Sequence, residues 1–452
     1  MPKGSLTYVG LFVIGLVLYT AVAGGRVFHA SSAPHFVYQA DAWLHGKTSI
    51  DPPLTGDDWA KVETVTLDDG SQVQGRRLTT RPAFRTLDGS ELPSTRIQSS
   101  AGKTTYMSFP PFPAVLMLPS ALLGGRDGND VIPTLLIAAC ILPLGLLVLR
   151  RLVEAGLSTR SLADDLWLVA TLAFGSVLFF SAVQGKVWYT AHVVGVALAL
   201  VYAWASIEAE YPVIAGLALG AAALTRTAMA FMVVLFLWEA GRNAGHASIW
   251  TWFDVLRRSL LRFAAPVVGF AILGCIYNHV RFGSLTEFGH TYLEVRQQAQ
   301  IEQFGLASYH YLARNLAVAF TLLPELSTHA PYLQISGHGL ALWLTTPVLL
   351  LVLWPRDKNG LYWGLWLTVL VVALPSLLYQ NSGWVQFGYR FSLDYLVFLI
   401  LLLAIGGRPF TRFTKALIIA GIVINLFGAL TFDRAWQYYR VGGNAYDVVV
   451  PQ

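Results

Sequence analysis

Residues 5–24 read SLTYVGLFVIGLVLYTAVAG, a run without a charged side chain. A helix of about 20 apolar residues spans the hydrocarbon core of a bilayer, so this run predicts a retained membrane-spanning helix whose start faces the cytoplasm. Further apolar runs predict ten more spans, at 131–149, 162–182, 190–207, 213–224, 228–239, 260–277, 335–354, 361–379, 391–405 and 413–432. We therefore expect an all-α polytopic membrane protein with about eleven transmembrane helices.

The composition supports a membrane protein. Of the 452 residues, 55% are hydrophobic and 13% are charged, and the mean hydropathy is +0.54. Soluble domains carry about 25% charged residues, so this composition excludes an ordinary soluble domain. No basic stripe alternates with aromatic residues, which argues against a nucleic-acid partner. Cys140 and Cys275 lie inside apolar runs, and we interpret both as packing residues.

The distribution of Lys and Arg predicts which loops face the cytoplasm, because short cytoplasmic loops are enriched in these residues. The predicted inner segments hold Lys3, Arg150, Arg151, Arg160, Arg242, Arg257, Arg258, Arg262, Arg356, Lys358, Arg408, Arg412 and Lys415. The predicted short outer segments hold only Lys186, Arg281, Arg296, Arg314 and Arg390. The 213–224 and 228–239 runs are short and could form one long tilted helix, which would invert everything downstream, but the downstream charges favour two.

We divide the chain into a first span at 1–26, an outer loop at 27–130, a helical bundle at 131–432 and an outer tail at 433–452. Residues 35–45 (HFVYQADAWLH) show the two-faced pattern of a helix lying in the membrane interface. Turn residues at 68–71 and 88–89 between alternating runs predict two β-hairpins in a small domain. Residues 108–119 (SFPPFPAVLMLP) are apolar but broken by prolines, a pattern tolerated at membrane depth only beside protein or a cavity. The sequence thus predicts a cavity at the outer face.

Ionisable side chains at or within the outer membrane boundary are the functional candidates, because each costs about 2.5–3.5 kcal/mol at a span centre unless it is paired or solvated. Plainer roles compete: Lys186 and Arg281 could only reach toward the interface, and the histidines could be structural. Arg390 and Asp394, four residues apart, could form a helix-end salt bridge. Arg226 lies between two apolar runs with no acid nearby in the sequence, so it requires an anionic ligand or a distant acid.

The order of these features resembles the bacterial GT-C membrane glycosyltransferases, a group similar to the protein O-mannosyltransferases and the lipid A aminoarabinose transferases. The segments that carry the resemblance are YQADAWLHG at 38–46, FPPFP at 109–113, LTRTA at 224–228, YNHVRFGSLTEFGHTY at 277–292 and GWVQFGYRFSLDYLVF at 383–398. The resemblance implies a polyprenyl-phosphate-linked sugar donor, transfer at the outer face, an inverting displacement, and a carboxylate base early in the first outer loop. An aspartate and several arginines below the outer interface would meet the needs of this reaction without a metal cofactor.

The chain departs from that family at one place. Relatives commonly carry an acid pair just before a Pro-His or Pro-aromatic step, whereas this chain has Ser32 and Ala33 there. Asp41 is therefore the expected base, with Asp51 second, because a carboxylate can accept the proton of an attacking hydroxyl. Cations would stabilise the departing phosphate, and we expect these to be Arg226, Arg281, Arg390, Lys103 and Lys186. The remaining expected pocket residues are His35, Tyr106, His192, His290, Gln386 and Asp394.

The sequence therefore predicts a glycosyltransferase in a bacterial cytoplasmic membrane that moves a sugar from a polyprenyl-phosphate carrier to a glycan, lipid or protein acceptor. Two other functions remain open. A transporter or flippase for a lipid-linked sugar would use the same cations without a base, and it should show internal repeats. A catalytically silent binding subunit would explain the missing acid pair.

Overall fold

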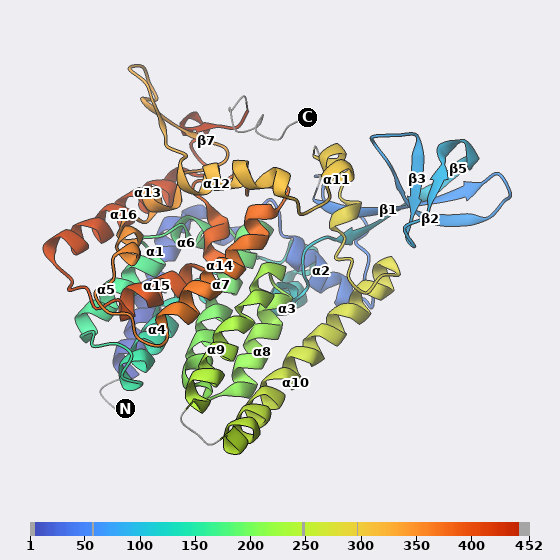
Figure 1. Ribbon diagram of the computed structural model, residues 1–452. Coiled ribbons are helices and arrows are strands. Elements are labelled where there is room, and N and C mark those ends of the chain that lie inside the picture. The colour runs from blue at the N-terminus through green and yellow to red at the C-terminus, as the bar shows by residue number, and fades with distance from the viewer. Residues whose placement is uncertain (1–4, 57, 246–248, 296, 443–452) are drawn as a thin grey trace.

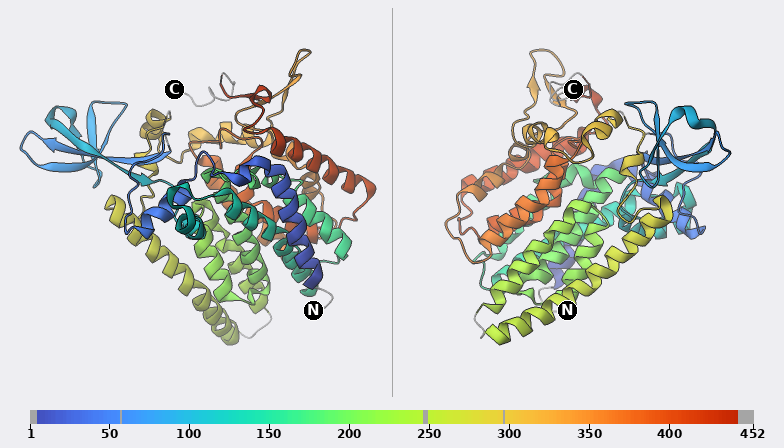
Figure 2. Two further views of the ribbon diagram at one scale, coloured as in Figure 1. Left: turned by 180° about the vertical axis from the view of Figure 1, so that it is seen from behind. Right: turned by 45° about the vertical axis from the view of Figure 1, so that its right-hand side comes forward.

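The computed structural model describes residues 5–56, 58–245, 249–295 and 297–442. A bundle of helices makes up most of the molecule, and a small β-sheet projects from one end of it (Figure 1). Two further views show the same arrangement, with the start of the described chain at the opposite end of the bundle from the sheet (Figure 2). The bundle helices are α1 (Ser5–Ala23), α4 (Val131–Glu154), α5 (Leu162–Ala173), α6 (Leu178–Ala182), α7 (Val187–Ser206), α8 (Pro212–Ala223), α9 (Val233–Ala244), α10 (Ile249–Phe282), α14 (Tyr362–Leu378), α15 (Leu396–Ile405) and α16 (Arg412–Thr431).

Several of these helices have the length and apolar composition of membrane-spanning helices. Within the described ranges, 5 helices are long and apolar enough to cross a membrane, namely Ser5–Phe28, Val131–Glu154, Val187–Ala209, Arg257–Phe282 and Arg412–Thr431. In the helices Ser5–Phe28 and Arg257–Phe282, only 17% and 11% of the most apolar stretch is buried within the protein. In Val187–Ala209 the buried share is 78%. Large exposed apolar surfaces on α1 and α10 are those of helices that face lipid, and the chain is a multi-pass membrane protein in which α7 is the most deeply buried of these five helices.

The expected number of eleven spans is not confirmed. The apolar helices Pro212–Ala223, Tyr362–Leu378 and Leu396–Ile405 are shorter than a full crossing. The predicted span at 335–354 is wrong, because this region folds as β7 (Leu333–Ser336), α13 (Leu342–Thr345) and η8 (Pro347–Leu353). Gly339 with φ 89 and Pro347 interrupt any continuous helix there. The predicted span at 162–182 is likewise split, into α5 and α6.

The pair of short runs after residue 210 forms two helices, as the charge pattern favours. The end of α9 returns to η4 (Ile207–Ala209), which precedes α8. Asn243 Nδ2 donates to the Glu208 carbonyl at 2.8 Å, and the Glu208 N–H donates to the Glu239 carboxylate at 2.8 Å. These contacts are impossible for one continuous helix, so α8 and α9 lie antiparallel.

The loops predicted to face the cytoplasm are joined to one another. Asn359 Nδ2 donates to the Leu157 carbonyl at 2.7 Å, and Trp238 Nε1 donates to the Gly360 carbonyl at 2.9 Å. Arg160 Nε donates to the Ala404 carbonyl at 3.2 Å. The arginine-rich loops therefore gather on one side of the bundle, which is the arrangement that the charge count requires.

The projecting sheet has five antiparallel strands in the order β4-β3-β2-β1-β5. Its strands are β1 (Trp59–Leu67), β2 (Gln72–Arg77), β3 (Ala83–Thr86), β4 (Glu91–Pro93) and β5 (Ile97–Met107). Both predicted hairpins are confirmed: β1 pairs with β2 across residues 68–71, and β3 pairs with β4 across residues 87–90. In the first turn the Asp69 carboxylate accepts the Ser71 N–H at 2.9 Å and Gly70 takes φ 82, as tight turns favour.

Two helices connect the sheet to the bundle. The predicted helix at 35–45 is confirmed as α2 (His35–Leu44). α3 (Phe112–Gly124) begins directly after Pro111 and continues through Pro113 and Pro119, so the prolines interrupt the chain only before Phe112. Proline is well tolerated in the first turn of a helix, because the N–H groups of that turn have no hydrogen-bond partner within the helix. Phe36 and Val37 of α2 pack with Met117 of α3 in one buried apolar cluster with Trp59 of β1.

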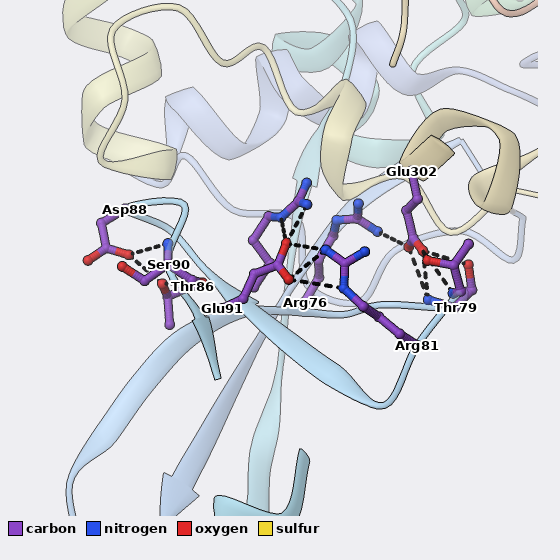
Figure 3. A network of polar contacts seen from close by, with 10 residues as sticks. Arg76, Thr79, Arg81, Thr86, Asp88, Ser90, Glu91 and Glu302 are labelled. Atoms are coloured by element: carbon purple, nitrogen blue, oxygen red, sulfur yellow. Dashed lines mark hydrogen bonds and ion pairs between the residues drawn. The ribbon is translucent and has the colours of Figure 1, made fainter. Parts of the chain in front are cut away.

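The segment between α10 and α12 (Leu312–Phe320) runs along the base of the sheet and includes α11 (Gln298–Phe304). Glu294 pairs with Lys61 at 2.9 Å and also with Lys103. Glu302 accepts the N–H groups of Thr79 and Thr80 at 3.0 and 2.9 Å and pairs with Arg76 at 2.8 Å (Figure 3). These ion pairs hold the segment against the sheet.

The described part of the C-terminal region adds a second sheet, in which β7 lies between β6 (Glu325–Leu326) and β8 (Tyr439–Arg440). Of the outer tail predicted at 433–452, residues 443–452 lie outside the described residues.

Candidate functional site

A cavity of about 480 Å³ lies between the base of the sheet and the adjacent ends of the bundle helices. It is lined by Asp58 and Gln297 and by residues within the segments 108–110, 186–191, 225–228, 290–295, 375–391 and 432–436. Polar and aromatic side chains dominate this lining, and four of the residues predicted from the sequence belong to it: Lys186, Arg226, His290 and Arg390.

Arg226 stands at the break between α8 and η5 (Thr227–Met232), where its extended backbone turns the side chain out of both helices. Its Nη2 lies 2.8 Å from Oδ2 of Asp394, and its Nε contacts Oδ1 of the same carboxylate. His192 Nδ1 lies 3.4 Å from Asp394 Oδ1 on the buried side. Asp394 is thus the distant acid that Arg226 requires, and the predicted Arg390–Asp394 salt bridge does not form.

Arg390 begins η9 (Arg390–Asp394) and is 6% exposed. Its Nη1 donates to the carbonyls of Gly383 and, at 3.2 Å, Val385, while the rings of Tyr189 and Phe391 each lie 5.4 Å from its guanidinium carbon. Its Nε has no hydrogen-bond partner, and the charge of Asp58 acts on the guanidinium. A buried guanidinium that is held by carbonyls and rings and keeps an unused N–H attracts an anion.

Two carboxylates line the cavity in the part of the chain that is described. Asp433 pairs with Lys186 at 2.7 Å and with Arg26 at 3.7 Å, so its charge is compensated. Asp58 is half-buried, just before β1, and its backbone carbonyl accepts the Ser108 hydroxyl at 2.8 Å. Its charge acts on Arg390 and Tyr379 across the cavity. Asp58 is therefore the carboxylate best placed to contact a ligand held by Arg390.

His290 enters the cavity from the segment that follows α10. It comes directly after Gly289, which has φ 100 and approaches Ala60 and Ser108 so closely that a side chain would not fit. Burial lowers the pKa of His290, and the nearby charges of Arg226 and Arg281 lower it further while Glu287 opposes them. The ring is therefore neutral at pH 7 and can donate or accept one hydrogen bond.

The two predicted bases lie outside the cavity lining. Asp41 is 7% exposed, and its carboxylate lies 3.4 Å from Arg126 Nε and 3.5 Å from His45 Nδ1. α2 presents Asp41 toward η3 (Gly125–Asp127) rather than toward the cavity, because α2 buries its opposite face against α3. Asp51 is exposed, and only its backbone carbonyl contacts Arg126.

Arg281, Lys103 and Tyr106 also lie outside the lining. Arg281 is 3% exposed and donates to the Met107 carbonyl at 2.6 Å and to Asn278 Oδ1 at 3.0 Å. It therefore fastens α10 to the end of β5 instead of facing a ligand. Lys103, on β5, pairs with Glu294 of the segment that follows α10, and Tyr106 packs edge-on against Phe282 with ring centres 5.3 Å apart.

His35, His192 and Gln386 lie behind the lining. His35 stacks on Trp59 with ring centres 4.1 Å apart, and burial lowers its pKa to about 4. Gln386 donates to the His338 and Ser382 carbonyls, both at 2.8 Å, and accepts the Arg390 N–H at 2.9 Å. Gln386 therefore positions the backbone of Arg390.

Several lining residues escaped the sequence analysis, namely Asp58, Trp188, Tyr189, Tyr379, Gln380, Asn381, Trp384, Asp433 and Trp436. For Asp58 the signal was the acidic pair that precedes Trp59 at the start of a predicted strand. For Gln380, Asn381 and Trp384 it was the polar interruption (QNSG) between two apolar runs, next to the GWVQFGYR motif. Among the described residues, no three His, Cys, Asp or Glu side chains are grouped so that they could hold a metal ion.

No protein-family model matches the chain, and none of the curated proteins searched matches it either. Solved structures of an oligosaccharyltransferase from the archaeon Archaeoglobus fulgidus align with 97–98% of this chain. The apo form aligns with TM-score 0.42 and 12% identity, and the form tethered to an acceptor peptide with an NVT sequon aligns with TM-score 0.44 and 13% identity. A complex with an inhibitory peptide and a dolichol-phosphate aligns with TM-score 0.42 and 10% identity. The chain spans 56–57% of the length of these structures.

Proposed function

We propose that the protein is a membrane glycosyltransferase that moves a sugar from a polyprenyl-phosphate-linked donor to an acceptor hydroxyl at the outer membrane face. The observation that carries the proposal is the cavity lined by both the buried guanidinium of Arg390, whose Nε has no hydrogen-bond partner, and the carboxylate of Asp58. The sequence motifs at 224–228, 277–292 and 383–398, which resemble GT-C glycosyltransferases, border this space.

The reaction requires removal of the acceptor proton and stabilisation of the negative charge on the departing phosphate in the same step. The acceptor oxygen attacks the anomeric carbon, its proton passes to Asp58, and the bond from the anomeric carbon to the phosphate oxygen breaks, so that the phosphate keeps the electron pair. A positioned carboxylate contributes about 10²–10⁴-fold to such a proton transfer. Arg390, supported by Arg226, compensates the charge that gathers on the phosphate. A single displacement of this kind inverts the anomeric configuration.

Asp58 replaces Asp41 as the base in this proposal because Asp41 faces Arg126 outside the cavity. The purified protein would be given a polyprenyl-phosphate sugar, and release of polyprenyl phosphate would be measured with acceptor and by slow hydrolysis. We expect Asp58→Asn to lower kcat about 10²-fold or more with little change in KM. Asp41→Asn and Asp433→Asn are matched controls, and both should retain transfer within a few-fold.

Full activity of Asp58→Asn, or loss of activity in a folded Asp41→Asn variant, would reject Asp58 as the base. Movement of the intact donor across a vesicle membrane without release of polyprenyl phosphate would identify a transporter instead. Saturable donor binding with neither release nor transport would identify a silent binding subunit.

A further inference from the structure

The loop at 379–385 contributes two different surfaces to the cavity. Its Gly383 and Val385 carbonyls hold the Arg390 guanidinium. Its Gln380, Asn381 and Trp384 side chains line the adjoining space. A group covalently attached to an anion on Arg390 is therefore within reach of this loop.

The carboxamide side chains of the loop each have an atom without a hydrogen-bond partner, and the loop that carries them is held in place by hydrogen bonds. The Gln380 N–H donates to the Leu306 carbonyl at 2.9 Å, and the Gln380 carbonyl accepts Arg314 Nη2 at 2.6 Å. The Gln380 side chain is 3% exposed, yet its Oε1 has no hydrogen-bond partner. Asn381 belongs to the cavity lining, and its Oδ1 accepts the Gly383 and Trp384 N–H groups at 2.8 and 3.0 Å, which leaves its Nδ2 as the donor for another group. A buried acceptor without a partner is costly, so it indicates a donor supplied by a ligand.

Aromatic faces complete this part of the lining. Trp384 is half-buried and its Nε1 donates to the Val441 carbonyl at 3.2 Å, which fixes its indole. Trp436 is 46% exposed and packs against Phe432 and Tyr439 with ring centres 6.0 and 5.9 Å away. The electron-rich face of an indole attracts positively polarised C–H groups. A pyranose presents C–H groups on its flat faces and hydroxyls at its rim, which matches an indole beside carboxamides.

The charges of the lining further restrict the ligand. Asp433 is compensated by Lys186, and Gln297, Gln380 and Asn381 are uncharged. An amino sugar requires a carboxylate at the position of its ammonium group, and a sugar acid requires an additional cation. The side chains that the loop itself contributes to the lining, Gln380, Asn381 and Trp384, carry no charge, and the proposed function already assigns Asp58 to the acceptor and Arg390 to the phosphate.

We propose that the 379–385 loop and Trp436 form a subsite for an uncharged pyranose, the sugar joined to the phosphate that Arg390 binds. This assignment rests on the proposed function, because it names the sugar class of the same donor. The Gln380 Oε1 accepts a sugar hydroxyl, Asn381 Nδ2 donates to another, and Trp436 covers one face of the ring.

Sugar binding can be measured without the lipid and without turnover. The full chain in detergent would be titrated with methyl pyranosides of glucose, mannose and galactose, and with glucosamine and glucuronate, while tryptophan emission is recorded. We expect at least one neutral pyranoside to bind saturably in the millimolar range and both charged sugars to bind about tenfold more weakly, a difference of about 1.4 kcal/mol. Gln380→Leu and Trp436→Leu should each weaken binding about tenfold. Trp354→Leu, which removes an indole outside the cavity, should not.

The subsite is rejected if a charged sugar binds as tightly as the best neutral one or if both lining variants bind normally. It is also rejected if no sugar binds saturably up to about 100 mM, far above the millimolar range of weak complexes. Saturation-transfer NMR on the unaltered chain, which should mark the ring protons of the bound pyranoside, covers the case in which a variant does not fold. Polyprenyl phosphate is titrated separately. Failure of Arg390→Leu to weaken lipid binding, with sugar binding intact, would defeat the proposed function but not the subsite.

Discussion

Arg226 and Arg390 bring the same charge into the cavity and are held in different ways. Arg226 is paired with Asp394 across 168 positions of sequence. Arg390 is held by carbonyls and rings and keeps one N–H without a partner. An anion entering the cavity must compete with the hydrogen-bonded Asp394 carboxylate at Arg226, whereas Arg390 keeps an N–H without a partner, which makes Arg390 the stronger anchor.

The Arg226–Asp394 pair leads to a prediction about stability. Asp394 is 1% exposed, and its removal leaves Arg226 without a counter-charge in a poorly hydrated place. We expect Asp394→Asn to destabilise the protein by about 3–5 kcal/mol, the usual cost of breaking a buried ion pair from one side. Thermal unfolding in detergent measures this. Glu325→Gln, which breaks the exposed pair with Arg440, is the control and should change stability by about 0–1 kcal/mol. Equal effects of the two substitutions would contradict the argument.

At the scale of elements, α8 depends on glycine for its contact with α10. A side chain at Gly216 would collide with the Phe263 carbonyl and Pro266, and one at Gly220 would collide with Phe270. Glycines four residues apart let two helices approach closely inside a membrane, where packing replaces the hydrophobic effect as the main driving force.

Gly216→Val should therefore destabilise the bundle by about 1–3 kcal/mol through overpacking. Gly10→Val in α1 is the matched control, because nothing lies within 4 Å of a side chain built there. Both substitutions change helix propensity equally, so thermal unfolding in detergent isolates the packing effect. A Gly216→Val variant no less stable than the control would show that α8 and α10 are not held at this contact.

The contact between the sheet and α11 depends on pH through Glu302. Burial alone would raise the pKa of this carboxyl, but the N–H groups of Thr80 and Thr79, the Thr80 hydroxyl and Arg76 lower it to about 2 (Figure 3). A carboxyl whose pKa is lower in the folded state stabilises the fold above its ordinary pKa of 4.5, and that contribution is lost as the pH falls toward 2.

We expect amide exchange in α11 and at Thr79 and Thr80 to be slow at pH 6 and to accelerate, after correction for the intrinsic rate, as the pH falls below 4.5. Glu302→Gln should accelerate this exchange at pH 6 by about tenfold or more and remove most of its pH dependence below neutral. An unchanged pH profile in the variant would show that other groups hold the segment.

At the scale of the whole molecule, the sheet lies at the opposite end of the bundle from the start of α1 (Figure 2). The arginine-rich loops are joined to one another through Asn359, Trp238 and Arg160. Because cytoplasmic loops are enriched in Lys and Arg, we infer that the sheet and the cavity face away from the cytoplasm.

This orientation predicts the pattern of cysteine labelling in intact cells. In a background with Cys140→Ala and Cys275→Ala, Gln72→Cys on the sheet should react with a membrane-impermeant maleimide added outside. Lys358→Cys in an arginine-rich loop should react only after the membrane is permeabilised. The reverse pattern would place the cavity on the cytoplasmic side and contradict transfer at the outer face.

Local pattern was enough to determine the apolar helices, both hairpins, the helix at 35–44 and four of the cationic and histidine residues of the cavity. Each of these depends on residues close together in the chain: a run of apolar residues, a turn at Asp69 and Gly70, or a charge that interrupts an apolar run. The span predicted at 335–354 failed for the same reason, because its average hydropathy concealed Gly339 and Pro347.

Which residues share the cavity was decided by the tertiary structure alone. Asp41 and Asp58 both follow the first span, and periodicity does not reveal that α2 presents Asp41 to Arg126 while β1 begins with Asp58 at the cavity. The partner of Arg226 lies 168 residues away. The carbonyls around Arg390 come from a loop that is held by Arg314 of α12 and by Val441, directly after β8. Ion pairs and ligand contacts act over a few ångströms of space, whereas the sequence records only neighbours along the chain.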